Sequence, residues 1–101
     1  MWVIVLFDLP VVEPKERKAA SEFRNFLQKE GFHMSQYSVY YRLTSGKEAV
    51  DNYIKKIKGA LPLKGKIDII SITDKQYENI ISFSGKEINS REKTSKQFLL
   101  F

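Results

Sequence analysis

The sequence WVIVLFDLP at residues 2–10 decides the fold of this chain. Its apolar residues from Trp2 to Phe7 are β-branched, aromatic or aliphatic, and no polar residue alternates with them. This pattern predicts a central β-strand that is covered on both faces. Asp8 supplies the only charge, at the last position of the strand. Its carboxylate either caps the following Leu-Pro turn or binds a divalent cation, and the stretch alone leaves both interpretations open.

Two amphipathic helices are predicted from the spacing of apolar residues. In residues 14–30, apolar side chains recur at intervals of three and four, and Pro14 suits a first helical turn, where its missing N–H is not needed. In residues 45–60 the same periodicity returns. Ser45 and Glu48 have the spacing of a capping box, which predicts that this second helix begins at the serine.

Further strands are predicted between and after the two helices. Residues 32–43 are rich in aromatic and β-branched side chains and form either one bent strand or two short strands hinged near Tyr37 and Ser38. Residues 66–73 form a strand of similar character. This order of elements is that of a ferredoxin-like α+β sandwich, with an antiparallel sheet on one side and two helices on the other.

The C-terminal part of the chain is predicted to close the domain and to continue as a tail. Asp74 caps a single helical turn, and residues 80–84 form a short strand. We therefore place one ferredoxin-like domain at residues 1–85 and a polar tail at residues 86–101, which ends in the apolar sequence FLLF. Such a segment needs a surface to cover it, and in a chain this small that surface can belong to a second copy.

Composition narrows the class of protein. The chain has 101 residues, enough for one domain, and 17 Lys and Arg against 12 Asp and Glu give a net charge of +5, which suits a polyanionic partner. There is no cysteine, which excludes disulfides and thiolate chemistry and fits a reducing cytoplasm. The N-terminal apolar run is too short for a signal peptide or a membrane span, so we expect a cytoplasmic protein.

Basic side chains concentrate on the first helix. Those near its start crowd the positive end of the helix dipole, and a phosphate would relieve this repulsion, although Glu13 and Glu16 also offset it. The cluster is therefore either a contact for nucleic acid or a solvated face. The candidate nucleic-acid-binding residues are Lys15, Arg17, Lys18 and Arg24.

The sequence contains few other candidates for catalysis. His33 is the only histidine, and its place at the start of a strand favours a structural role. There is no glycine-rich phosphate loop and no HExxH motif. The tyrosines of residues 37–41 are able to stack on bases, but packing in a core or a dimer explains them as well.

Four stretches, in order and at matching spacing, resemble a known family. They are FDLP at residues 7–10, RKAASEFRNFL at 17–27, GFHMSQYSVY at 31–40 and ITDKQYENI at 72–80. Together they resemble CRISPR-associated protein two, the small partner of the spacer-acquisition integrase, in the variant found in systems with a single large effector nuclease. The resemblance covers residues 1 to about 85.

This resemblance implies a ferredoxin-like homodimer in which Asp8 is the metal-binding and catalytic residue and faces its counterpart across the two-fold axis. The metal would be Mg²⁺ or Mn²⁺. Family members are described as metal-dependent endonucleases on RNA or DNA. They are also described as non-catalytic bridges that bind duplex DNA and two dimers of the integrase, CRISPR-associated protein one. The tail would dock on the partner subunit.

Two other classes of function remain compatible with the residues. One is a toxin-like ribonuclease with the same sandwich, which would cleave RNA without any integrase. The other is a small ferredoxin-like regulatory module that binds a metabolite, although no ligand loop is recognisable in the sequence.

Overall fold

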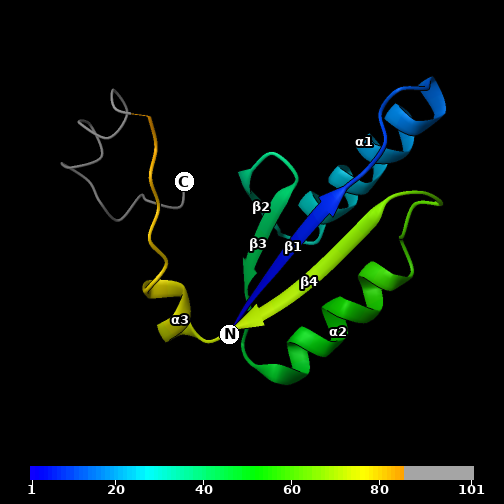
Figure 1. Cartoon of the computed structure of the whole chain (residues 1–101). Helices are drawn as coiled ribbons and strands as arrows, with labels where there is room; N and C mark the ends of the chain where they lie inside the picture. The colour runs from blue at the N-terminus through cyan, green and yellow to red at the C-terminus, as the bar shows by residue number, and fades with distance from the viewer. Residues whose placement is uncertain (86–101) are drawn as a thin grey trace.

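The computed structural model describes residues 1–85, and the predicted tail at residues 86–101 lies outside them. Strands and helices alternate along the chain as the sequence predicts, with a strand pair between the two long helices (Figure 1). The elements are β1 (Trp2–Asp8), α1 (Pro14–Lys29), β2 (His33–Gln36), β3 (Val39–Leu43), α2 (Lys47–Lys58), β4 (Lys66–Ile72) and α3 (Asp74–Glu78).

The sheet has four strands in the order β2-β3-β1-β4, and all neighbouring strands are antiparallel. β1 therefore lies inside the sheet, between β3 and β4 (Figure 1). Residues 32–43 form two strands, and the turn between them contains Ser38 in the left-handed region at φ 65°. This topology confirms the predicted ferredoxin-like α+β fold.

The core lies between the two long helices and one face of the sheet, which we call the covered face. Val3, Val5 and Phe7 of β1 point to this face and are 0%, 0% and 7% exposed. The Phe7 ring packs edge-to-face on Phe23 of α1, with ring centroids 5.2 Å apart. Ile57 of α2 belongs to the same apolar cluster, so both helices close the same face.

The opposite face of the sheet, which we call the uncovered face, corrects one prediction. The apolar run in β1 predicts cover on both sides, but within residues 1–85 the long helices cover only one. The apolar residues that alternate with the core positions are only half-buried or exposed. By strand register, those on the uncovered face are Trp2, Ile4, Leu6, Val39, Tyr41, Leu43, Ile70 and Ile72.

The short helix α3 reaches one end of the uncovered face. The Tyr77 ring stacks on Trp2 with centroids 3.7 Å apart and planes 6° apart, and Tyr41 lies beside both rings. Partial burial, with Tyr41 nearby, raises the pKa of Tyr77 to about 12. Both effects favour the neutral phenol, so Tyr77 stays protonated at neutral pH.

Three local predictions are wrong. α2 begins at Lys47 with the extended glycine Gly46 as its N-cap, so Ser45 lies one residue too early to form the predicted capping box. α3 is capped by Thr73, whose hydroxyl accepts a hydrogen bond from the backbone N–H of Gln76, and not by Asp74. Residues 80–84 are not a strand. In the first two cases a neighbouring residue occupies the cap position, which spacing alone locates poorly.

Candidate functional site

Asp8 lies at the carboxyl end of β1, on the uncovered face of the sheet. It shares this face with Ile4 and Leu6 because side chains alternate along a strand. The β-ladder places it directly opposite Lys66, the first residue of β4. The Asp8 side chain is exposed and lines a hollow of about 260 Å³. We call this the Asp8 hollow; its residues are Leu6, Phe7, Asp8, Ser38, Val39, Lys66 and Asp68.

A second carboxylate lines the same hollow. Asp68 lies opposite Leu6 in the ladder and therefore projects from the same face as Asp8. Lys66 lies opposite Asp8 and two residues before Asp68 on β4, and its Nζ is 3.7 Å from Asp68 Oδ2. Asp68 was not among the candidate residues predicted from the sequence. The alternation in KIDIISI separates the two faces of β4, but only the strand register shows which residues lie beside Asp8.

The β2–β3 turn closes another side of the Asp8 hollow. The Ser38 carbonyl accepts a hydrogen bond of 3.0 Å from the Phe7 N–H, so the ladder between β1 and β3 continues to the residue before Asp8. The left-handed conformation of Ser38 aims its carbonyl at β1. This contact fixes the backbone from which the Asp8 side chain leaves.

Gly65, just before β4, fixes the end of β1 on the side opposite to β3. Its φ is +101°, and a Cβ at this position would lie 2.8 Å from the Asp8 carbonyl oxygen and 2.6 Å from Leu9 Cδ2. Only glycine allows both this backbone conformation and this close approach. The turn before β4 therefore packs directly on the Asp8–Leu9 peptide.

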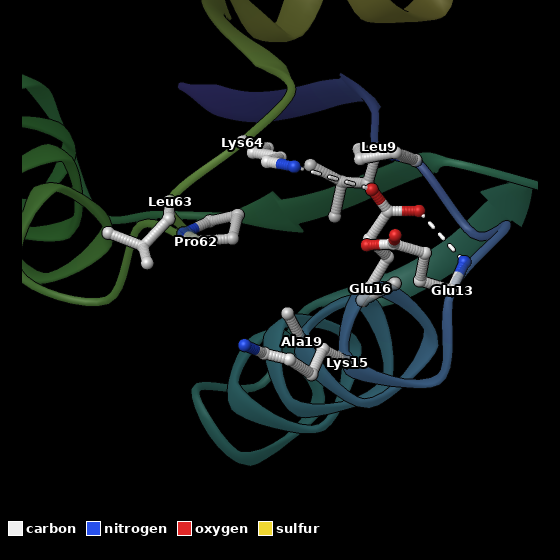
Figure 2. A pocket seen from close by; sticks show the side chains of 10 residues that line it. Leu9, Glu13, Lys15, Glu16, Ala19, Pro62, Leu63 and Lys64 are labelled. Carbon is white, nitrogen blue, oxygen red and sulfur yellow. Dashed lines mark hydrogen bonds and ion pairs between the residues drawn. The ribbon is translucent and has the colours of Figure 1, made fainter.

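A second hollow lies just beyond Asp8, between the β1–α1 loop, the start of α1 and the α2–β4 loop. It has a volume of about 220 Å³ and a mostly apolar lining that includes Leu9, Pro62 and Leu63 (Figure 2). We call it the apolar pocket. Leu63 is fully exposed beside it. It offers an apolar contact surface, and its charged lining residues are Glu13, Lys15, Glu16 and Lys64.

Glu16 supports the loop at the rim of the apolar pocket. Its Oε1 accepts a hydrogen bond of 2.9 Å from the Glu13 N–H, and Lys64 Nζ lies 3.7 Å from its Oε2 (Figure 2). The bond from Glu13 is the largest cause that lowers the pKa of Glu16, and the Val12 N–H and Lys64 contribute in the same direction. Glu16 thus serves to begin α1.

The predicted nucleic-acid-binding residues all lie on α1, and none lines the Asp8 hollow. Arg17 is held by the preceding loop, where its Nη1 donates to the Val12 carbonyl at 2.7 Å. Arg24 donates to Ser21 Oγ at 3.2 Å. Lys15 and Lys18 are exposed on the helix surface. Arg17 is exposed as well, but its guanidinium is held by the loop, so the two lysines are the exposed members of this group that no such bond restrains within residues 1–85.

His33 does not line the Asp8 hollow either. It is exposed on β2, with its ring tilted against Tyr41 at a centroid distance of 5.9 Å. The structural role of His33 stays a prediction.

The donor set of the Asp8 hollow suits a magnesium-like ion. Within residues 1–85, no group of three or more His, Cys, Asp or Glu side chains converges to hold a metal. Mg²⁺ needs no such cage, because it binds one or two carboxylates and keeps several waters. Asp8 and Asp68 supply hard oxygen ligands on the same face, so the residues fit this ion and do not fit zinc.

The fold and the site together define a small ferredoxin-like domain with a pair of carboxylates at the rim of an uncovered sheet face. Residues 1–80 match the family of CRISPR associated protein Cas2, and the chain belongs to this family. None of the helices in the described part of the chain is long and apolar enough to cross a membrane.

Curated relatives extend this similarity to the whole chain. One from Paracidovorax avenae is 48% identical over 101 residues, covering 100% of this chain and 94% of the relative. One from Flavobacterium psychrophilum is 44% identical and one from Parvibaculum lavamentivorans 39% identical, and both cover 100% of this chain, with 88% and 100% of the relatives covered. Each of the three is named CRISPR-associated endoribonuclease Cas2.

Proposed function

We propose that this chain is an endoribonuclease subunit that acts as a homodimer and uses a divalent cation, Mg²⁺ or Mn²⁺, bound at Asp8. The observation that carries the proposal is the position of Asp8, exposed on the uncovered face in a hollow shared with Asp68. The relatives named as endoribonucleases support the choice of RNA as substrate.

The uncovered face supports the homodimer. Its half-buried apolar side chains form a continuous stripe across β3, β1 and β4, a surface that small soluble domains rarely leave in water. A two-fold axis through this face would bury the stripe of both copies against each other. It would also bring two Asp8 hollows to the same side of the assembly.

The chemistry proposed for the site is hydrolysis of a phosphodiester. A bound divalent cation would lower the pKa of a water molecule and neutralise charge on the phosphate. Asp8 would hold this ion, and Asp68 would share the task or orient a bound water. Gly65 and the Ser38 carbonyl keep the backbone at Asp8 fixed, so the carboxylate needs little reorganisation to bind.

Asp8→Asn tests this function. The substitution keeps the size of the side chain and removes the charge that binds the cation. We expect it to lower metal-dependent cleavage of a labelled single-stranded RNA about a hundredfold or more and to weaken Mn²⁺ binding measured by electron paramagnetic resonance. Asp51→Asn is the matched control, because Asp51 is exposed on α2 and does not line the hollow. Cleavage that survives both Asp8→Asn and EDTA would refute the proposal.

We also propose that the dimer binds duplex DNA and bridges dimers of the CRISPR-associated integrase during spacer acquisition. The exposed lysines of α1 and the net charge of +5 support DNA binding, since phosphate contacts need no base recognition. The apolar pocket offers a surface for a protein partner at the start of the same helix. This role needs a rigid dimer but no cleavage.

Charge reversal tests the DNA contact without disturbing the loop that Arg17 holds. We expect Lys15→Glu together with Lys18→Glu to weaken duplex binding and to lower the salt slope of binding by about two. The control is Lys55→Glu with Lys58→Glu on α2, which changes the net charge equally. Equal losses from both pairs would show a general charge effect and would refute a specific path along α1.

A further inference from the structure

Lys66 is the cation that the sheet places beside Asp8. The two residues lie directly opposite each other in the antiparallel ladder and project from the same face. Residues in such pairs have Cβ atoms about 5 Å apart. The long side chain of Lys66 therefore reaches over the Asp8 hollow, which it lines.

The contact that holds Lys66 is weak. Its Nζ lies 3.7 Å from Asp68 Oδ2, close to the outer limit of an ion pair, and the two side chains are 79% and 59% exposed. Exposed pairs of this kind contribute little to stability. The ammonium can therefore leave Asp68 for a more strongly charged acceptor without disturbing the fold.

The charges of the hollow favour such a cation. Asp8 and Asp68 carry negative charge on the face that an RNA phosphate must approach, and the two like charges repel it. Lysine is a compact charge on a flexible stem and binds phosphate oxygens well. An ammonium directly across from Asp8 offsets this repulsion where the scissile phosphate would lie.

We propose that Lys66 binds the substrate phosphate of RNA at Asp8 and that Asp68 holds the ammonium over the hollow until RNA arrives. This role rests on the proposed function. Lys66 positions the phosphate for the ion bound at Asp8, and it takes no part in proton transfer.

Lys64 provides a close comparison within the same loop. It lies on the other side of Gly65, and its Nζ pairs with Glu16 Oε2 at the rim of the apolar pocket. It does not line the Asp8 hollow. Lys64→Gln and Lys66→Gln therefore remove the same charge from positions two residues apart, but only one of these positions faces Asp8.

The test compares these two variants in RNA cleavage and in RNA binding. We expect Lys66→Gln to raise KM for RNA about tenfold with a smaller change in kcat, and to lower the salt slope of RNA binding by about one. Lys64→Gln should change KM less than twofold. Mn²⁺ affinity should not fall in Lys66→Gln, because removing a nearby positive charge does not disfavour a cation.

Two results would overturn the role of Lys66. One is an unchanged KM and salt slope in Lys66→Gln, and the other is an equal change in Lys64→Gln. RNA binding is measured by fluorescence anisotropy, so this comparison does not depend on cleavage. Failure of the proposed function shows separately, as cleavage that Asp8→Asn leaves intact.

Asp68→Asn tests the second half of the proposal. It removes the carboxylate that competes with phosphate for the ammonium. We therefore expect the Kd for RNA, measured by fluorescence anisotropy without divalent cation, to fall or to stay within twofold of the wild-type value, whatever part Asp68 takes in holding the ion. A rise in this Kd similar to that of Lys66→Gln would show that Lys66 needs Asp68 in order to bind RNA. That result would refute the role assigned to Asp68.

Discussion

The two faces of β1 differ in whether helices of the same chain cover them. Val3, Val5 and Phe7 pack under α1 and α2 and are at most 7% exposed. Ile4 and Leu6, which alternate with them along the strand, face away from both long helices. Within residues 1–85, the long helices therefore bury one face of the sheet and leave the other face without such cover.

This difference separates the residues that stabilise the fold from those to which we assign the proposed function. The covered face holds the aromatic core, and substitutions there act on the free energy of unfolding. The uncovered face ends at Asp8 and Lys66, and substitutions there act on the proposed association and chemistry. The same strand can serve both purposes because its side chains alternate with a period of two.

The largest effect is expected on the covered face. Phe23→Ala removes a ring that is 2% exposed and packs on Phe7, and we expect it to lower the free energy of unfolding by about 3–5 kcal/mol. Urea denaturation at a fixed protein concentration measures this change. Phe83→Ala is the control, because that ring is 86% exposed and should change stability by less than about 0.5 kcal/mol. Similar losses in both variants would contradict the assignment of the core.

The next effect is expected on the uncovered face. Ile4→Asp places a charge in the middle of the apolar stripe, where the proposed dimer would bury it. We expect the dissociation constant of the dimer to rise at least about a hundredfold, near 3 kcal/mol, as measured by analytical ultracentrifugation. Val12→Asp on the exposed β1–α1 loop is the control and should leave association unchanged. A dimer that persists in Ile4→Asp would show that the copies associate elsewhere.

The sequence predicted the fold well where local pattern decides it. The periodicity of residues 14–30 and the apolar run of β1 locate α1 and the central strand to within a residue or two. The prediction that β1 is covered on both faces was wrong. A strand that helices bury on both sides and a strand that they bury on only one side can have the same apolar run. The sequence shows that both faces of β1 are apolar, but it does not show which element covers each face.

The site was predicted only in part for a similar reason. Asp8 stands out locally, as the charge that ends an apolar run. Asp68 and Lys66 join it through the pairing of β1 with β4, and this register depends on contacts between segments about 60 residues apart. The role of Arg17 was also not predictable from the sequence, because its guanidinium folds back and donates a hydrogen bond to the Val12 carbonyl.

A smaller effect is expected from alanine substitutions at two glycines, Gly65 and Gly31. Gly65 and Gly31 have φ values of +101° and +86°, so alanine at either position costs about 1–2 kcal/mol of backbone strain. A Cβ at Gly31 meets the flexible Arg42 guanidinium, whereas one at Gly65 meets the backbone of Asp8 and Leu9. We expect both alanine variants to lose stability, but only Gly65→Ala to weaken Mn²⁺ binding. Equal Mn²⁺ affinities in the two variants would show that Gly65 does not position Asp8.

The smallest effect is expected at Glu16, where the helix that closes the covered face begins. Its pKa in the folded protein lies below the ordinary value of 4.5, so its contribution to stability is present at neutral pH and is lost as the pH falls through the folded pKa. Glu16→Gln keeps an oxygen that can accept the Glu13 N–H but cannot ionise. We therefore expect the stability difference between wild type and variant to be largest near pH 7 and to vanish in acid, as measured by urea denaturation at a series of pH values. Glu22→Gln, in the middle of the exposed side of α1, should show no such trend, and an equal trend there would mean that net charge and not the capping bond causes the pH dependence.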